Sequence, residues 1–93
     1  MTCGTGKTHC PLTFEILGSG LKAAKLERRL SCALAGLGYR AAVTTRIDDE
    51  RALALGATRE PVLVADGKLL TDGLPRTEAL EEALRHHPAL AAN

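Results

Sequence analysis

Cysteine and histidine side chains have the clearest capacity for chemistry in this chain. Cys3, Cys10 and Cys32 carry thiols, and His9 directly precedes Cys10. Thiolates and imidazoles bind Zn²⁺ or Cu⁺, and two thiols that meet can form or exchange a disulfide. An odd number of cysteines argues against a secreted disulfide framework, so these thiols are expected to be free, metal-bound or redox-active. The simpler interpretation is that Cys32 is a small buried helix residue and that the other two lie in a flexible arm.

Residues 4–8 (Gly-Thr-Gly-Lys-Thr) imitate the end of a phosphate-binding P-loop. The full motif needs a glycine at position 1, where this chain has Met1, and it lies between a strand and a helix. Here a strand is expected to follow the run instead. We therefore expect neither nucleotide binding nor any other cofactor.

Size and composition predict one domain in a chain of 93 residues. Charged residues make up 25% of the chain and the net charge is +1, so no basic surface for nucleic acid is expected. No apolar run approaches the roughly 20 residues of a membrane span, and the N-terminus lacks the apolar segment of a signal peptide. We expect a cytoplasmic protein with a flexible arm at residues 1–10 and a folded domain at residues 11–93.

The hydrophobic pattern divides the domain into seven elements. Strands are expected at residues 12–17, 39–47, 62–65 and 68–71, and helices at residues 21–37, 48–55 and 77–87. Apolar residues recur at helical spacing from Leu26 to Leu37, and residues 39–47 alternate like an edge strand. Asp48 and Thr77 are expected to cap their helices, and Pro88 to end the last one. Asp66-Gly67 predicts a tight hairpin turn.

The resulting order is β-α-β-α-β-β-α. The first two strands flank a helix and should be parallel, with a right-handed crossover. The last two strands form an antiparallel hairpin. A mixed four-stranded sheet with helices on both faces accommodates this order, and the fold class is α/β.

Three segments resemble the thioredoxin-like superfamily, in particular its small glutaredoxin-like, redox-active disulfide proteins. Residues 18–20 (Gly-Ser-Gly) resemble the glycine turn before the family's Cys-x-x-Cys, residues 56–62 resemble its Gly-x-x-x-x-Pro segment, and residues 64–68 resemble the hairpin that follows. The resemblance covers about residues 12–87. It implies a thioredoxin-like fold in which Pro61 is cis and lies beside the active-site turn.

The redox cysteines of that family are missing from this chain. Carried over residue by residue, the nucleophilic cysteine falls on Leu21 and the resolving cysteine on Ala24. Neither side chain can form a mixed disulfide, so dithiol exchange at this turn is excluded. The first hypothesis is therefore a degenerate active site: a non-catalytic module, not an enzyme. It would bind a protein, peptide or small ligand in a groove formed by Gly20, Leu21, Lys22, Glu60 and Pro61.

Two alternatives place chemistry elsewhere in the chain. The first is a thiol-disulfide oxidoreductase or thiol sensor that uses Cys3, Cys10 or Cys32, with Cys10–Cys32 or Cys3–Cys10 as candidate disulfides. The second is Zn²⁺ or Cu⁺ binding by Cys3, His9 and Cys10, although adjacent His9 and Cys10 are not a usual zinc spacing. The predicted topology brings all three cysteines, with His9, His86 and His87, to the pole opposite the glycine turn. The simpler interpretation of His86 and His87 is that they are exposed helix-end residues.

Overall fold

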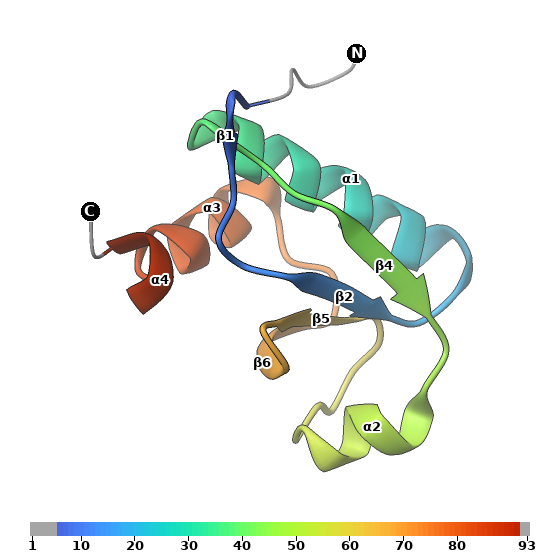
Figure 1. The fold of residues 1–93 in the computed structure, drawn as a ribbon. Coiled ribbons are helices and arrows are strands. Elements are labelled where there is room, and N and C mark those ends of the chain that lie inside the picture. Colours follow the sequence, from blue (N-terminus) through green and yellow to red (C-terminus); the bar gives the residue numbers. More distant parts are fainter. Residues whose placement is uncertain (1–5, 92–93) are drawn as a thin grey trace.

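A mixed four-stranded sheet forms the centre of the computed structural model, which describes residues 6–91 (Figure 1). Its strands lie in the order β4-β2-β5-β6. They are β2 (Phe14–Leu17), β4 (Val43–Arg46), β5 (Val62–Ala65) and β6 (Lys68–Asp72). β2 is parallel to β4 and antiparallel to β5, and β5 and β6 form the antiparallel hairpin. The chain is thus an α/β domain with the mixed sheet that the sequence predicted.

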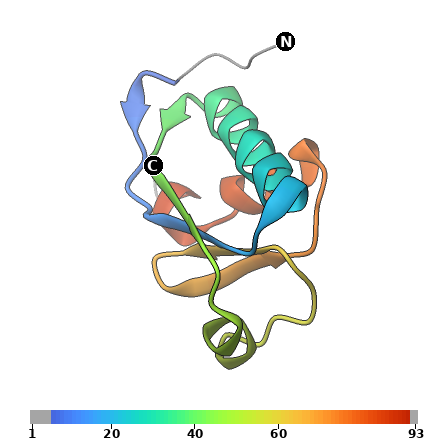
Figure 2. The ribbon, with the colours of Figure 1, turned by 90° about the vertical axis from the view of Figure 1, so that its right-hand side faces the viewer.

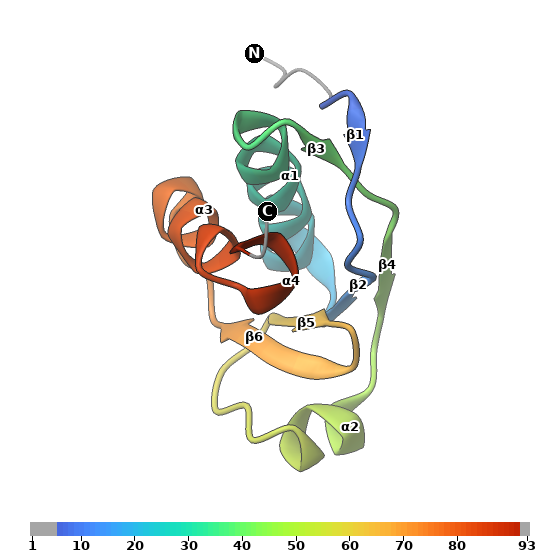
Figure 3. The same ribbon diagram turned by 60° about the vertical axis from the view of Figure 1, so that its left-hand side comes forward.

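Helices cover both faces of this sheet (Figure 2). One face carries α1 (Gly20–Gly36), α3 (Thr77–Arg85) and the short α4 (Pro88–Ala91), whereas α2 (Asp49–Ala54) lies on the other (Figure 3). None of the helices within residues 6–91 is both long and apolar enough to cross a lipid bilayer.

The side chains of β2 explain this division because they alternate between the two faces. Phe14 and Ile16 are fully buried in the larger core, which α1 and α3 close with Leu26, Leu30 and Leu80, among others. Leu17 points the other way and packs with Val62 and Val64 beneath α2. The strand end is therefore apolar on both faces, as its sequence indicated.

The N-terminal segment differs from the predicted flexible arm. Within it, β1 (Thr8–His9) pairs in parallel with β3 (Tyr39–Arg40), and the N–H of Cys10 donates to the carbonyl of Arg40 at 2.8 Å. Cys10 is buried in the larger core. Residues 8–10 are therefore attached to the domain.

The predicted strand at residues 39–47 is likewise two strands, β3 and β4. β3 pairs with β1 and β4 pairs with β2, so the partner changes between them. Pro11 lies between those two partners and has no N–H to continue a ladder. β4 is an edge strand of the main sheet, as predicted.

Of the three residues expected to begin or end helices, only Asp48 has the role that was predicted for it. The side chain of Asp48 accepts a 3.0 Å hydrogen bond from the N–H of Arg51 and caps α2, as expected. Thr77 is the first residue of α3, and the cap position belongs to Arg76. Pro88 does not simply end the last helix but begins α4, because proline has no N–H to leave unpaired in a first turn.

Backbone conformation confirms two further predictions. Asp66 and Gly67 both have positive φ, 50° and 80°, as a type I′ hairpin turn requires. The Glu60–Pro61 peptide bond is cis, as the resemblance implied.

Candidate functional site: the Leu21–Pro61 surface

The glycine turn after β2 lies directly against Pro61. A Cβ atom added to Gly18 would be 3.1 Å from Cβ and 3.3 Å from Cα of Pro61. The N–H of Gly18 donates to the carbonyl of Arg46 at 2.9 Å, which ties the turn to the end of β4. The two segments that the resemblance places side by side therefore meet. A side chain at Gly18 would push Pro61 away by a few tenths of an ångström, and it would have to adopt a φ of 154°, which favours glycine.

Leu21 and Ala24 stand at the beginning of α1, and both are exposed. Leu21 has 81% of its surface exposed although it is one of the largest apolar residues of the chain. The cap residue Ser19 makes no side-chain hydrogen bond, and the first turn of α1 contains no acidic residue. The turn thus presents an apolar side chain beside a helix N-terminus, and neither Leu21 nor Ala24 supplies a nucleophile.

Two more large apolar side chains are exposed around this end of the sheet. Ile47 is 70% exposed and follows Arg46, which pairs with Leu17 immediately before the glycine turn. Leu53 is 74% exposed on α2. Sequence reasoning missed both, because it placed Ile47 inside a strand at residues 39–47 and Leu53 only within a helix at residues 48–55, with nothing to show its exposure. We call the exposed residues Leu21, Ile47 and Glu60, together with the adjoining backbone of residues 18–20 and 60–61, the Leu21–Pro61 surface. The side chain of Pro61, a predicted groove residue, is itself fully buried and lies beneath this surface.

A hollow of about 270 Å³ lies next to this surface, between α2 and the segment that leads into β5. Its lining consists of Asp49, Ala52, Leu53, Ala57, Thr58, Arg59, Glu60 and Val62. Of the predicted groove residues, only Glu60 lines it; Gly20, Leu21, Lys22 and Pro61 do not. This hollow thus lies on the α2 side of Pro61.

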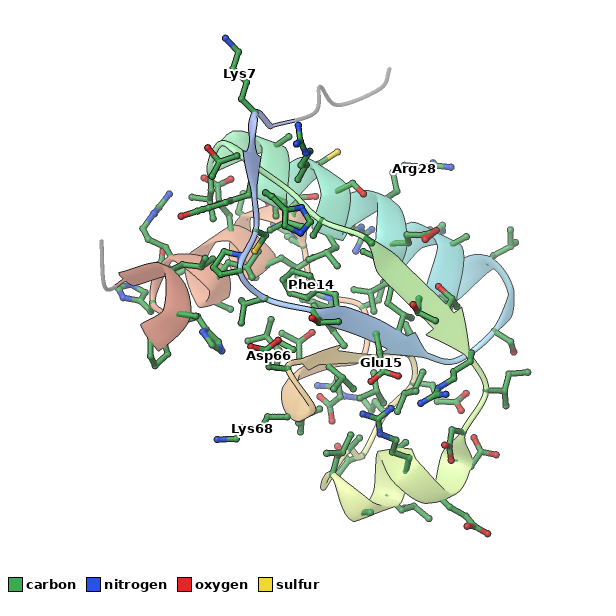
Figure 4. The ribbon with its side chains drawn as sticks, viewed as in Figure 1. Lys7, Phe14, Glu15, Arg28, Asp66 and Lys68 are labelled. Carbon is green, nitrogen blue, oxygen red and sulfur yellow. The ribbon has the colours of Figure 1, made fainter. Side chains whose placement is uncertain are left out.

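Two polar contacts hold the walls of this hollow. The carboxylate of Glu15, on the face of β2 toward α2, accepts hydrogen bonds from Arg51 at 2.7 Å and contacts Arg46 at 2.9 Å (Figure 4). The hydrogen bond from Arg51 is the main cause that lowers the pKa of Glu15 below its ordinary value. On the opposite wall, the N–H and hydroxyl of Thr58 donate to Asp72 at 2.9 and 3.0 Å, which lowers the pKa of that carboxyl.

No protein-family model matches the chain, and no curated protein matches it. The chemistry of the surface therefore follows from its own residues: exposed apolar side chains, a helix N-terminus and a nearby hollow with charged residues in its lining.

The candidate cysteines lie away from the Leu21–Pro61 surface. Cys10 is a free thiol with 2% of its surface exposed, and burial raises its pKa above the ordinary value. It therefore takes part in neither of the disulfides considered above, and it is not an activated thiolate. Cys32 is half-buried and disulfide-bonded. It stands eleven residues after Leu21 in α1, or about 16 Å along the helix axis. Cys3 lies outside the described residues.

The predicted metal ligands are not assembled in the described part of the chain. His9, the last residue of β1, is exposed, whereas Cys10, the residue after it, is buried in the larger core. His86 contacts Glu82 at 2.7 Å, and Nδ1 of His87 accepts from the N–H of Ala89 at 3.1 Å. Among residues 6–91, no three His, Cys, Asp or Glu side chains form a group that could hold a metal ion.

Proposed function

We propose that this chain is a thioredoxin-like domain without the redox dithiol, and that it is a cytoplasmic, non-catalytic module that binds a peptide segment of a partner protein. The binding site is the Leu21–Pro61 surface. One observation carries the proposal: Leu21, at the position of the family's nucleophilic cysteine, is 81% exposed beside a turn that packs on Pro61.

The connectivity supports the thioredoxin-like part of this proposal. The main sheet and its helices follow the order β2-α1-β4-α2-β5-β6-α3, with a parallel pair around α1 and an antiparallel hairpin after α2. α1 and α2 lie on opposite faces of the sheet (Figure 3). These are the features that the resemblance implies for the family.

The exposed side chains support binding in preference to catalysis. Burying one large aliphatic side chain contributes about 1.5–3 kcal/mol, so a partner that covers both Leu21 and Ile47 gains appreciable free energy. An extended peptide suits this surface because the two side chains come from different elements at one end of the sheet, α1 and the residue after β4.

A peptide-display selection against the full chain, followed by titration of the enriched peptides, tests the proposal. Leu21→Asp should weaken binding of those peptides at least tenfold, because it places a charge where an apolar contact is expected. Aspartate is favourable in the first turn of a helix, so this variant should fold normally. Ala79→Asp, at an exposed position on α3, is the matched control for the added charge and should bind as the parent chain does. Equal binding by Leu21→Asp and the parent would remove the surface as the site.

A thiol-disulfide role is the second candidate, because Cys32 is disulfide-bonded. In this case the chemistry would lie at the far end of α1 and not at the glycine turn. Mass spectrometry after alkylation, with and without prior mild reduction, measures the number of reactive thiols. A redox role requires that Cys32 become alkylated after mild reduction and be protected again after mild oxidation; a Cys32 that remains freely alkylated under oxidation contradicts it.

A further inference from the structure

We infer that the hollow between α2 and residues 57–62 is a pocket for a basic side chain, lysine or arginine, of the segment bound at the Leu21–Pro61 surface. This inference rests on the proposed function and adds the chemical class that the module selects. It is carried by the shape of the hollow, by the division of its lining into an apolar and an acidic part, and by its position next to Pro61.

The apolar part of the lining suits a long hydrocarbon chain. Ala52 and Leu53 come from α2, Ala57 from the loop that follows, and Val62 from the start of β5. Leu53 is 74% exposed, so it forms a lip that a bound chain would cover. Lysine and arginine bury their methylene stems against such surfaces while the charged end stays near polar groups.

The carboxylates in the lining belong to Asp49 and Glu60. Both residues are exposed, and within residues 6–91 neither carboxylate forms an ion pair. The cation in the lining is Arg59, and its charge is directed elsewhere. Its Nε and Cζ atoms lie 3.5 and 3.6 Å from the position of a Cβ on Gly73, and it acts electrostatically on Asp72. Two acidic groups are therefore left to attract a cationic ligand.

The walls are fixed before a ligand arrives. Arg51, on α2, is bound to Glu15 of the sheet, and Thr58 is bound to Asp72 of β6. Because these contacts hold both sides of the hollow, little conformational freedom would be lost on binding.

Size and position suit one side chain of a larger ligand. Pockets for small-molecule ligands usually enclose about 300–1,000 Å³, and this hollow encloses about 270 Å³. Glu60 lines the hollow and is bonded to Pro61, which packs on the glycine turn before Leu21. Pro61 is itself buried, so a peptide would cross the backbone between Leu21 and Glu60, with one residue on Leu21 and a neighbouring basic residue in the hollow.

The test uses n-butylammonium as a probe of the lysine side chain and n-butanol as its uncharged counterpart. Both are titrated into the full chain while backbone amide shifts are followed by nuclear magnetic resonance. We expect n-butylammonium to shift the amides of Ala52, Leu53 and Thr58, and to bind about fivefold more tightly than n-butanol, as two partly exposed carboxylates would give. Equal binding of the two probes, or shifts that lie elsewhere on the chain, would overturn the inference.

Variants that neutralise Asp49 and Glu60 test whether their carboxylates attract the cationic probe. Asp49→Asn combined with Glu60→Gln should remove the preference for the cation, and Glu60→Gln alone, which leaves the first turn of α2 intact, should halve it. The control is Glu27→Gln with Glu78→Gln, which removes the same charge at exposed positions on α1 and α3 and should keep the preference. A preference retained by the Asp49/Glu60 pair contradicts the inference.

The two proposals fail in different ways. Leu21→Asp should abolish peptide binding yet leave n-butylammonium binding unchanged, because Leu21 does not line the hollow. If the selected peptides need Leu21 but n-butylammonium binds no more tightly than n-butanol, the pocket for a basic side chain is disproved and peptide binding at the Leu21–Pro61 surface stands. If n-butylammonium binds as expected but no peptide depends on Leu21, the hollow still takes a basic group and the Leu21–Pro61 surface is not the peptide site.

Discussion

Arg51 of α2 donates a 2.7 Å hydrogen bond to Glu15, in the middle of the central strand β2. Arg46, on the edge strand β4, contacts the same carboxylate at 2.9 Å. One carboxylate therefore joins two strands and the helix that covers them. None of the six residues of α2 is fully buried, so this contact makes an important contribution to fixing the helix on the sheet.

The first prediction concerns pH. The pKa of Glu15 is lowered in the folded chain, so the contact stabilises the fold above the pKa of an unfolded glutamate and its contribution is lost as the pH falls through the folded value. Glu15→Gln should therefore lower the urea midpoint at pH 7, and the difference from the parent should shrink progressively below about pH 4. Urea unfolding of both chains between pH 3 and 7 measures this. A difference that is constant over the whole range would show that the charge of Glu15 is not what matters.

The second prediction concerns the glycine turn. In Gly18→Ala the new Cβ would lie 3.1 Å from Cβ of Pro61, so the turn and Pro61 must move apart. We expect a loss of about 1–3 kcal/mol in the free energy of unfolding and weaker peptide binding. Both should be visible in urea titrations and in the peptide assay described above.

Gly18→Ala also carries backbone strain, because Gly18 has a φ of 154°, and Gly20→Ala shows the effect of a positive φ without crowding. Gly20 also has a positive φ, 73°, but a Cβ there would have nothing within 4 Å. Gly20→Ala should lower the free energy of unfolding by only about 1 kcal/mol, because of backbone strain, and should retain peptide binding. Equal effects of the two alanine substitutions would mean that the contact between Gly18 and Pro61 has no special role.

The third prediction concerns Cys10. Its thiol is buried and has a raised pKa, so it should remain protonated and inaccessible at pH 8. In the native chain it should react with a thiol reagent at least tenfold more slowly than in concentrated urea, since attack requires local opening of the core. Peptide mapping after timed alkylation assigns the rate to this residue. Rapid labelling of native Cys10 would contradict its burial and would revive its role as a reactive thiol.

The sequence predicts elements well where local chemistry decides them. Asp66-Gly67 tolerates positive φ, Asp48 can accept from a helix N–H, and the leucines of α1 repeat with the helical period, so these features need no knowledge of the fold. β1 could not be predicted, because Thr8 and His9 carry no hydrophobic period. Their strand exists only because β3 lies beside them.

One part of the candidate site could be expected from the sequence, whereas another part depends on tertiary packing. The meeting of the glycine turn with Pro61 is implied by the resemblance of residues 18–20 and 56–62 to the thioredoxin-like family, and not by the pattern of elements. The exposure of Leu53 and the hollow beside it depend on how α2 sits on the sheet, and a six-residue helix with apolar residues at positions 52, 53 and 55 does not reveal which of them faces inward.

The last prediction uses two leucines that the sequence alone treats alike. Leu26 of α1 is fully buried in the larger core, whereas Leu53 of α2 is 74% exposed. Leu26→Ala should cost about 2–5 kcal/mol because it removes buried methyl groups and leaves a cavity. Leu53→Ala should change the free energy of unfolding by no more than about 0.5 kcal/mol, yet weaken n-butylammonium binding because it shortens the lip of the hollow. Urea unfolding and the probe titration give both values. A large loss of stability in Leu53→Ala would mean that this side chain packs in the fold and is not available to a ligand.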